Sequence, residues 1–454
     1  MLTAFKSIDK LNIKNNKMKY TKLVLSLILV MGLGFGGCKN YTKKVVRIWH
    51  TESDANAKKA FQRIVDKYEK IHPNVKIEWE AISWGALSEK LTIAMATGEE
   101  PDITHLEPFM VASLYSKGLL EPIDDVFNVI GDDIFPAVKD LQKFGNKHYG
   151  IAYAIGTTYY SYRSDWANKK DSKSLTWDEY IKMLNEIKNK PGAILPGGSS
   201  FFMDQLFAET VACNGGRLFD DNGKPTFTEK QVIESLNFIK KISKTCSKDW
   251  TNIGYQEQFI QYAAGKGFSV PVTYARASKQ IDKSTSKNID APNSFSVMEQ
   301  PIGPSGKKSY ATIDCEPWVI FKSSKVKKEA KDFLKFFYKK DNYIDFCSQV
   351  PIHLNPIFKS MAYGDTYQNL PFVKKWHKWE DLSLKMISSE RVKPILLVED
   401  NDKKLPFLME LQGSRIITDM IFDVAVNNED PMFAAKKANM KAEKLIEKLG
   451  YKKW

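Results

Sequence analysis

The stretch "VVRIWHTESDANAKKAFQRIVDKYEKIHPNVKIEWEAI", which spans Val45–Ile82, decides the fold. It opens on VVRIWH, whose β-branched and aromatic residues predict a buried strand. Apolar residues then recur at helical spacing over residues 57–68, behind Ser53 or Asp54 as the helix N-cap. Residues 74–82 alternate between apolar and polar, as a second strand does. This strand–helix–strand order is the building unit of a parallel sheet covered by helices.

The same organisation continues along the chain and then restarts. A helical stripe closed by Gly98 and the strand PDITHL (101–106) complete a first unit, and new strand patterns begin at Tyr149. We therefore expect an α/β protein with two lobes around a cleft, each lobe a sheet flanked by helices, and a helical C-terminal region. The expected N-terminal lobe comprises 45–153 and 311–358, and the expected C-terminal lobe comprises 154–310 and 359–454.

Residues 1–37 are typical of a signal peptide, with lysines ahead of an apolar run. The uncharged stretch from Leu23 to Cys38 holds 16 residues, which is short for a membrane span. Small residues directly before Cys38 resemble a bacterial lipoprotein box, so we expect Cys38 to carry lipid and residues 38–44 to act as a linker. The alternative is an ordinary cleaved signal with an incidental cysteine. The glycines of this segment lack the flanking strand and helix of a nucleotide loop.

The charge pattern argues against a nucleic-acid partner. The formal net charge is +13, and six lysines and one aspartate of the leader supply +5 of it, which leaves about +8. The remaining lysines do not form a basic stripe interleaved with aromatic residues. We expect no cofactor and no metal. The other cysteines lack metal-ligand spacing, and both disulfides and buried free thiols remain open for Cys213, Cys246, Cys315 and Cys347.

Polar and aromatic residues follow the predicted strands. Ligands of α/β sheets bind outside the carboxyl ends of the strands. The candidate ligand-binding residues on these loops and at the crossing between lobes are Glu52, Trp84, Glu107, Phe109, Thr157, Tyr160, Tyr274, Arg276, Glu316 and Trp318. Aromatic rings beside a few polar groups suit a sugar, and we expect Trp84 and Tyr274 to be stacking platforms, one from each lobe. For Trp318, inside an apolar run, a core position is the alternative.

The sequence offers little support for catalysis, and we expect no enzyme. It contains no HExxH or GxSxG motif, and its acid pairs are adjacent in sequence rather than opposed across a cleft. A surface glycoside hydrolase, with an acid pair formed across the fold, is the less favoured alternative. A receptor for a non-sugar solute such as polyamine or ferric iron is another, with Tyr159, Tyr160 and Tyr162 as iron ligands. In a strand, however, Tyr159 and Tyr160 point to opposite faces.

Several segments together resemble the extracellular solute-binding proteins of family 1, the maltose-binding-protein-like receptors of ABC importers. The matching segments are the opening stretch, "LTIAMATGEEPDITHLEPFMVASLYSKGLLEPIDD", "YGIAYAIGTTYYSYRSDW", "TWDEYI" and "WVIFKSSKVKKEAKDFLKFFY". By position, the resemblance places ligand contacts on the loop with Glu52, on Trp84, Glu107, Phe109 and Thr157, and around Tyr274 and Arg276. The family often has glycines where Cys315-Glu316-Pro317-Trp318 stands here. As candidate contacts, Glu316 and Trp318 therefore depart from the family's pattern.

The resemblance also implies how the protein works. It implies a type II periplasmic-binding-protein-like fold whose lobes close by a hinge on a sugar or oligosaccharide. The closed form would then meet an ABC permease in the membrane. We expect an exported, lipid-anchored monomer that faces the periplasm or the cell exterior.

The lipid anchor leads to a direct test. Cys38→Ala removes the thiol that would carry the acyl chains, so we expect the variant to leave the detergent phase on fractionation. If Cys38→Ala stays in the detergent phase, the anchor lies elsewhere.

Overall fold

The computed structural model describes residues 43–139, 141–167, 174–284, 290–389, 391–393, 405–452 and 454. The predicted signal peptide and Cys38 lie outside these ranges. Residues 44–454 form one compact unit, which is described below. Within the described ranges, no helix combines the length and the apolar character needed to cross a bilayer.

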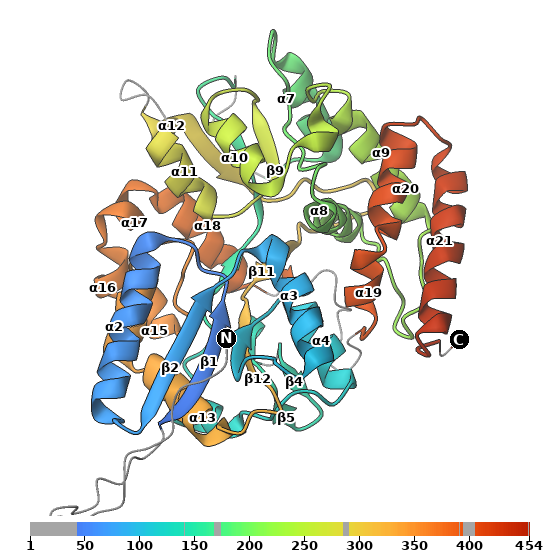
Figure 1. The fold of residues 1–454 in the computed structure, drawn as a ribbon. Helices are drawn as coiled ribbons and strands as arrows, with labels where there is room; N and C mark the ends of the chain where they lie inside the picture. Colours follow the sequence, from blue (N-terminus) through green and yellow to red (C-terminus); the bar gives the residue numbers. More distant parts are fainter. Residues whose placement is uncertain are drawn as a thin grey trace, which may run out of the picture. The chain divides into compact units, whose positions relative to one another are not determined.

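The first sheet has five strands in the order β2-β1-β3-β12-β6. Their bounds are β1 Lys44–His50, β2 Val75–Ala81, β3 Ile103–His105, β12 Pro317–Ile320 and β6 Ile151–Ala152. β1 pairs in parallel with β2 and β3, whereas β12 runs antiparallel to both β3 and β6. The sheet therefore combines the early part of the chain with a late strand. Figure 1 shows this mixing of colours, with the orange α13 (Lys327–Phe337) beside the blue strands.

The opening stretch folds as its periodicity predicts. The helix α2 (Ala55–Ile71) connects β1 to β2 and buries the predicted apolar face. Asp54 is its N-cap and accepts hydrogen bonds from two backbone N–H groups of the first turn. The next helix, α3 (Trp84–Thr97), ends at Gly98, which has a φ of 70° that glycine adopts without a Cβ clash. α4 (Pro108–Ser116) follows β3.

The second sheet corrects the expectation that the parallel pattern simply restarts. Its strands are β10 (Phe295–Met298), β8 (Tyr159–Arg163) and β9 (Ser269–Thr273), in that order, and both pairings are antiparallel. Parallel pairing is therefore confirmed for β1, β2 and β3. It is wrong for the second sheet and for the pairings of β12 and β6. The physical reason is that β9 and β10 return from helices far along the chain, so their direction is not set by a short crossover.

A third, short sheet lies where the chain passes between the two larger ones. It has the order β13-β11-β7, with β7 at Gly156–Thr157, β11 at Ala311–Asp314 and β13 at Val392–Lys393. β7 and β11 are antiparallel, with Asp314 opposite Gly156. Each continues directly into a strand or loop of the first sheet, so these segments form the crossing between the lobes.

Helices pack on the second sheet and on one another. The longer ones are α7 (Trp177–Glu186), α8 (Ser200–Cys213), α9 (Lys230–Ser243), α10 (Tyr255–Ala263), α11 (Arg276–Ser284), α18 (His377–Ile387), α20 (Ile416–Ala425) and α21 (Pro431–Lys448). Thr176 and Glu179 form a capping box at α7, and Asp430 caps α21 ahead of Pro431.

The late helices are shared between the two lobes. α14 (Lys340–Cys347) packs against α2, whereas α20 and α21 pack against α9 and α18 packs against β10. The short α19 (Leu408–Gly413) contacts both α4 and α8. The predicted lobe boundaries stay a proposal. The remaining short elements are α5 (Asp124–Ile130), α6 (Pro136–Lys139), β4 (Lys143–Phe144), β5 (Lys147–His148), η1 (Trp250–Asn252), α12 (Ala291–Ser294), α15 (Lys359–Ala362), α16 (Asp365–Gln368) and α17 (Pro371–Lys375).

Candidate functional site

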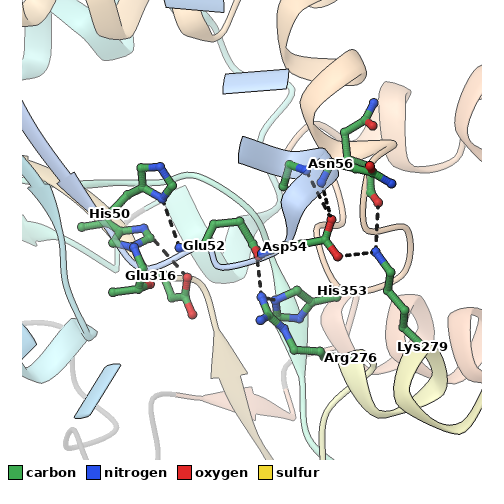
Figure 2. A network of polar contacts seen from close by, with 12 residues as sticks. His50, Glu52, Asp54, Asn56, Arg276, Lys279, Glu316 and His353 are labelled. Atoms are coloured by element: carbon green, nitrogen blue, oxygen red, sulfur yellow. Dashed lines mark hydrogen bonds and ion pairs between the residues drawn. The ribbon is translucent and has the colours of Figure 1, made fainter. Parts of the chain in front are cut away.

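The loop after β1 carries Glu52, whose side chain has no exposed surface. Glu52 Oε1 accepts a hydrogen bond from the backbone N–H of Asp54 at 2.7 Å, and Oε2 accepts one from Arg276 Nη2 at 2.8 Å (Figure 2). Arg276 begins α11, directly after β9 and Tyr274. The ion pair therefore joins the edge of the first sheet to a helix that belongs with the second.

Arg276 also reaches the crossing between the lobes. Its Nη2 lies 2.6 Å from Nε2 of His353. The pKa of His353 lies well below its ordinary value because of burial first, and then because of the positive charges of Arg276 and Lys279. His353 is therefore neutral and accepts the hydrogen bond from the guanidinium. Burial lowers the pKa of Arg276, but the combined electrostatic effect of Glu52 and of the further groups around the guanidinium outweighs burial, so the pKa lies above its ordinary value.

A second ion pair lies beside the first. Lys279 Nζ is 2.6 Å from Asp54 Oδ2 and 3.4 Å from the carbonyl oxygen of Gln349 (Figure 2). Burial alone would raise the pKa of Asp54, but the hydrogen bond from Lys279 and those from the first turn of α2 outweigh it, so the pKa is lowered. Asp54 thus caps α2 and holds α11 at once.

Three further carboxyl groups gather near Arg276. They are Glu107, the N-cap of α4, Asp314 at the end of β11, and Glu316 two residues later. Burial and then the charge of Asp314 raise the pKa of Glu107 to about 8. Burial raises the pKa of Asp314 to about 6, against the opposing effect of Arg276. The pKa of Glu316 lies well above its ordinary value because of burial and then because of the other two carboxyls.

Two of these carboxyls line a small cavity at the crossing. The lining residues are Tyr153, Ala154, Asp314, Cys315, Glu316, His353 and Leu354. Glu316 has a φ of 24°, in the left-handed region that favours glycine. The family resemblance predicts glycine in this segment, and the chain instead holds a carboxylate here at some cost in backbone strain.

Aromatic rings continue the site on the side of the second sheet. Phe202 and Tyr255 are stacked with ring centroids 3.9 Å apart, and Tyr274 meets both rings edge-on, at 6.1 Å and 6.2 Å. The hydroxyl of Tyr274 accepts a hydrogen bond from Gln205 Nε2. These rings offer an apolar surface next to the carboxyls.

An apolar pocket of about 250 Å³ lies between α4 and the C-terminal helices. It is lined by Phe109, Asp204, Leu408, Leu411, Gln412 and Ile417. Phe109 also lies 6.0 Å, between ring centroids, from Phe201 of α8. Glu107 and Phe109 therefore flank the start of α4, one toward the carboxyl cluster and the other toward this pocket.

The structure places other predicted contacts among packed residues. Thr157 is buried and its hydroxyl donates to the carbonyl oxygen of Thr312 at 3.0 Å. Tyr160 is buried against the ring of Tyr180. Trp318 is buried in β12 and stacks on His105 with ring centroids 5.0 Å apart. As ligand contacts these residues stay predictions.

The side chain of Trp84 lies outside the part of the chain that the structure describes, although its backbone begins α3. Tyr159 packs on Trp379 and Tyr160 on Tyr180, so the two tyrosines face apart as strand geometry predicts. Among the described residues, no group of three or more histidine, cysteine or acidic side chains is placed to hold a metal ion. The four cysteines beyond residue 42 are free thiols.

Sequence reasoning missed Asp314, Phe202 and Tyr255. Asp314 ends the strand ATID, two residues before the candidate residue Glu316. Its place at a strand end is a signal that could have identified it. Phe202 lies in the first turn of α8 and Tyr255 in the first turn of α10. The rule that ligands bind at the carboxyl ends of strands therefore could not identify them.

Comparisons with known proteins agree with this architecture. A family model described as bacterial extracellular solute-binding protein matches residues 63–375. The chain is 23% identical over 338 residues to a putative binding protein of Brucella abortus, an alignment covering 71% of this chain and 79% of that one. It is 25% identical over 241 residues to the mannitol-binding protein of Pseudomonas aeruginosa, covering 51% of this chain and 55% of that one. The maltose-bound MalE3 of T. maritima matches with a TM-score of 0.73 at 16% identity, covering 88% of this chain and 100% of that chain. The predicted two-lobed fold is thereby confirmed.

The raised pKa of Glu107 predicts a pH dependence of stability. The folded protein keeps this carboxyl protonated up to about pH 8, whereas the unfolded chain ionises it near 4.5. The group's contribution is therefore full below the unfolded value and is lost as the pH rises toward 8. We expect the free energy of unfolding of the ligand-free protein to fall between about pH 5 and pH 8, and Glu107→Gln to reduce that fall by about 1 kcal/mol or more. Glu257→Gln, on the exposed side of α10, is the control and keeps the wild-type slope. Denaturant unfolding at each pH measures this, and equal slopes in all three proteins contradict it.

Proposed function

The chain belongs to the bacterial extracellular solute-binding protein family, and on this premise we propose that it captures a sugar or polyol between its two lobes for an ABC importer. Membership in this family makes it a binding protein of an ABC transporter and not an enzyme, as the sequence predicted. Such proteins act outside the cytoplasm, bind small solutes and work with permease subunits. The particular solute, the lipid anchor on Cys38 and delivery by hinge closure belong to the proposal.

The single observation that carries the proposal is the pair of contacts from α11 to the loop after β1. Glu52 and Arg276 are 224 residues apart in the sequence, and Asp54 and Lys279 are 225 residues apart. Both contacts therefore connect distant segments of the chain. Carboxyls, a guanidinium and aromatic rings meet at the same place. Directed polar groups beside ring faces are what a polyhydroxylated solute needs for its hydroxyls and its C–H face. The mannitol-binding and maltose-bound relatives support this solute class.

Closure follows from where these contacts lie. A solute in the site touches residues of both lobes only when the lobes are together, so binding shifts the population toward the closed form. The crossing segments around β7 and β11 are where a hinge would turn. A lipid on Cys38 would keep the receptor close to the permease that accepts the closed form.

A thermal-shift screen tests the solute class. The panel contains sugars, polyols, amino acids, polyamines and ferric citrate. A solute present at about 100 times its dissociation constant should stabilise the protein by roughly 2.7 kcal/mol. We expect sugars or polyols to raise the melting temperature. A response to ferric citrate alone contradicts the proposal and favours the iron receptor.

The ion pair between Lys279 and Asp54 predicts a loss of affinity when it is broken. Lys279→Ala removes a partly buried pair worth about 1 kcal/mol, so we expect solute affinity to fall about threefold to tenfold. Lys375→Ala is the control, because Lys375 pairs with Asp282 of α11 without involving the loop after β1. Calorimetric titration with the best solute of the screen measures both. Equal losses in the two variants, or none, show that the Lys279 contact does not contribute to closure.

A further inference from the structure

Acidic groups outnumber cations at the crossing. The charge of Asp314 contributes to the raised pKa of Glu107, and the charges of Asp314 and Glu107 contribute to that of Glu316, after burial in both cases. The nearby cation, Arg276, already donates to Glu52 and His353. Among the described residues no lysine or arginine is found in hydrogen-bond or ion-pair contact with these three carboxyls, so no protein cation in direct contact favours their ionised form.

Glu316 shows this most directly. Its residue is 8% exposed, and Oε2 has no hydrogen-bond partner in the part of the chain that the structure describes, although Tyr153 contributes a hydrogen bond to the carboxyl. The nearest basic atom is Nδ1 of His105, at 3.9 Å, which is beyond hydrogen-bond distance. The pKa of His105 lies well below its ordinary value because of burial, so the ring carries no charge. Oε2 of this buried carboxyl therefore lacks a hydrogen-bond donor among the described residues, and Glu316 is one of the residues that line the cavity at the crossing.

Three kinds of group could act as a partner for the Glu316 carboxyl, and their chemistry distinguishes them. A buried carboxylate needs a hydrogen-bond donor and a compensating charge. A metal ion would need more ligands than the described residues bring together. A neutral hydroxyl donates a hydrogen bond but leaves the charge uncompensated. A protonated amine supplies up to three donors and one positive charge, and charge-assisted hydrogen bonds are about twice as strong as neutral ones.

The neighbouring rings fit the rest of such a solute. Tyr255 and Tyr274 lie within electrostatic range of Asp314 and Glu107, and their rings meet edge-on with centroids 6.2 Å apart. A ring face accepts the C–H side of a sugar and also attracts a cation. Carboxyls and aromatic rings are the two kinds of group that a solute both polyhydroxylated and basic needs.

We propose that the solute carries a basic nitrogen, as an amino sugar or aminated polyol does, and that its ammonium group binds between Asp314 and Glu316. This inference rests on the proposed function, the capture of a sugar or polyol. Within that class, the carboxyl pair selects aminated members against their neutral counterparts.

Matched probes test the proposal by calorimetric titration of the full mature chain at neutral pH. D-glucosamine is compared with D-glucose, and the disaccharide of chitosan with cellobiose, so that each pair differs chiefly in its amino groups. We expect the aminated member to bind at least tenfold more tightly. Putrescine is added as an amine without a sugar.

Two variants locate the ammonium group. Glu316→Gln and Asp314→Asn keep the approximate shape of each side chain, but the amide cannot ionise and carries a donating NH2 where the carboxylate has a second acceptor oxygen. We expect either change to lower the affinity for the aminated probe about tenfold and to leave the neutral probe within about threefold. Glu380→Gln is the matched control, because Glu380 is also fully buried with a raised pKa but lies with Asn355 and Gln368. Melting temperatures verify folding, and Asp314→Asn carries the test if Glu316→Gln does not fold.

The possible outcomes distinguish failure of the amine inference from failure of the proposed function. Neutral sugars that bind as tightly as their aminated counterparts overturn the inference and leave the proposed function standing. Binding of putrescine but of no sugar or polyol overturns the proposed function and supports an amine site. An amine preference that survives both Glu316→Gln and Asp314→Asn, or no binding of any probe, overturns the inference.

Discussion

The buried ion pair between Glu52 and Arg276 is the contact on which the arrangement of the site depends. Glu52 has no exposed side-chain surface, so separating the two groups without supplying water or another cation would leave an uncompensated buried charge. That penalty favours the position of α11 against the loop after β1. From there Arg276 reaches His353, and Lys279 reaches the N-cap of α2. One guanidinium therefore sets the relation of three segments that are far apart in the sequence.

The remaining carboxyls make the ligand-free site electrostatically unsatisfied. Each of Glu107, Asp314 and Glu316 has a raised pKa, which means that the protein holds protons there at the expense of ionisation. Groups that destabilise the empty site but can be compensated by a solute are a mark of binding sites, since the solute then gains differential affinity for the assembled form.

Local sequence patterns predicted the helices and strands better than they predicted which strands pair with one another. The helical stripe of α2, its Asp54 cap and the two flanking strands follow from residues within one turn or one strand of each other. The antiparallel second sheet does not, because Ser161 pairs with Val270, more than a hundred residues away. The same distinction holds at the site. Glu52 and Arg276 were recognisable as residues after strands, whereas Phe202 enters through the packing of α8 on Tyr255, which no local pattern encodes.

The crossing segment links the chemistry of the site to the motion expected of it. Asp314 is hydrogen-bonded in β11 opposite Gly156, and Glu316, two residues on, has the positive φ that glycine adopts more easily. A glycine here would relax the backbone but would carry no carboxyl. The strained backbone therefore holds a charged group at the point where the chain passes from one sheet to the other. Because Glu316 lies on this segment, the proposed ammonium group would act directly on the backbone that turns in the proposed closure of the lobes.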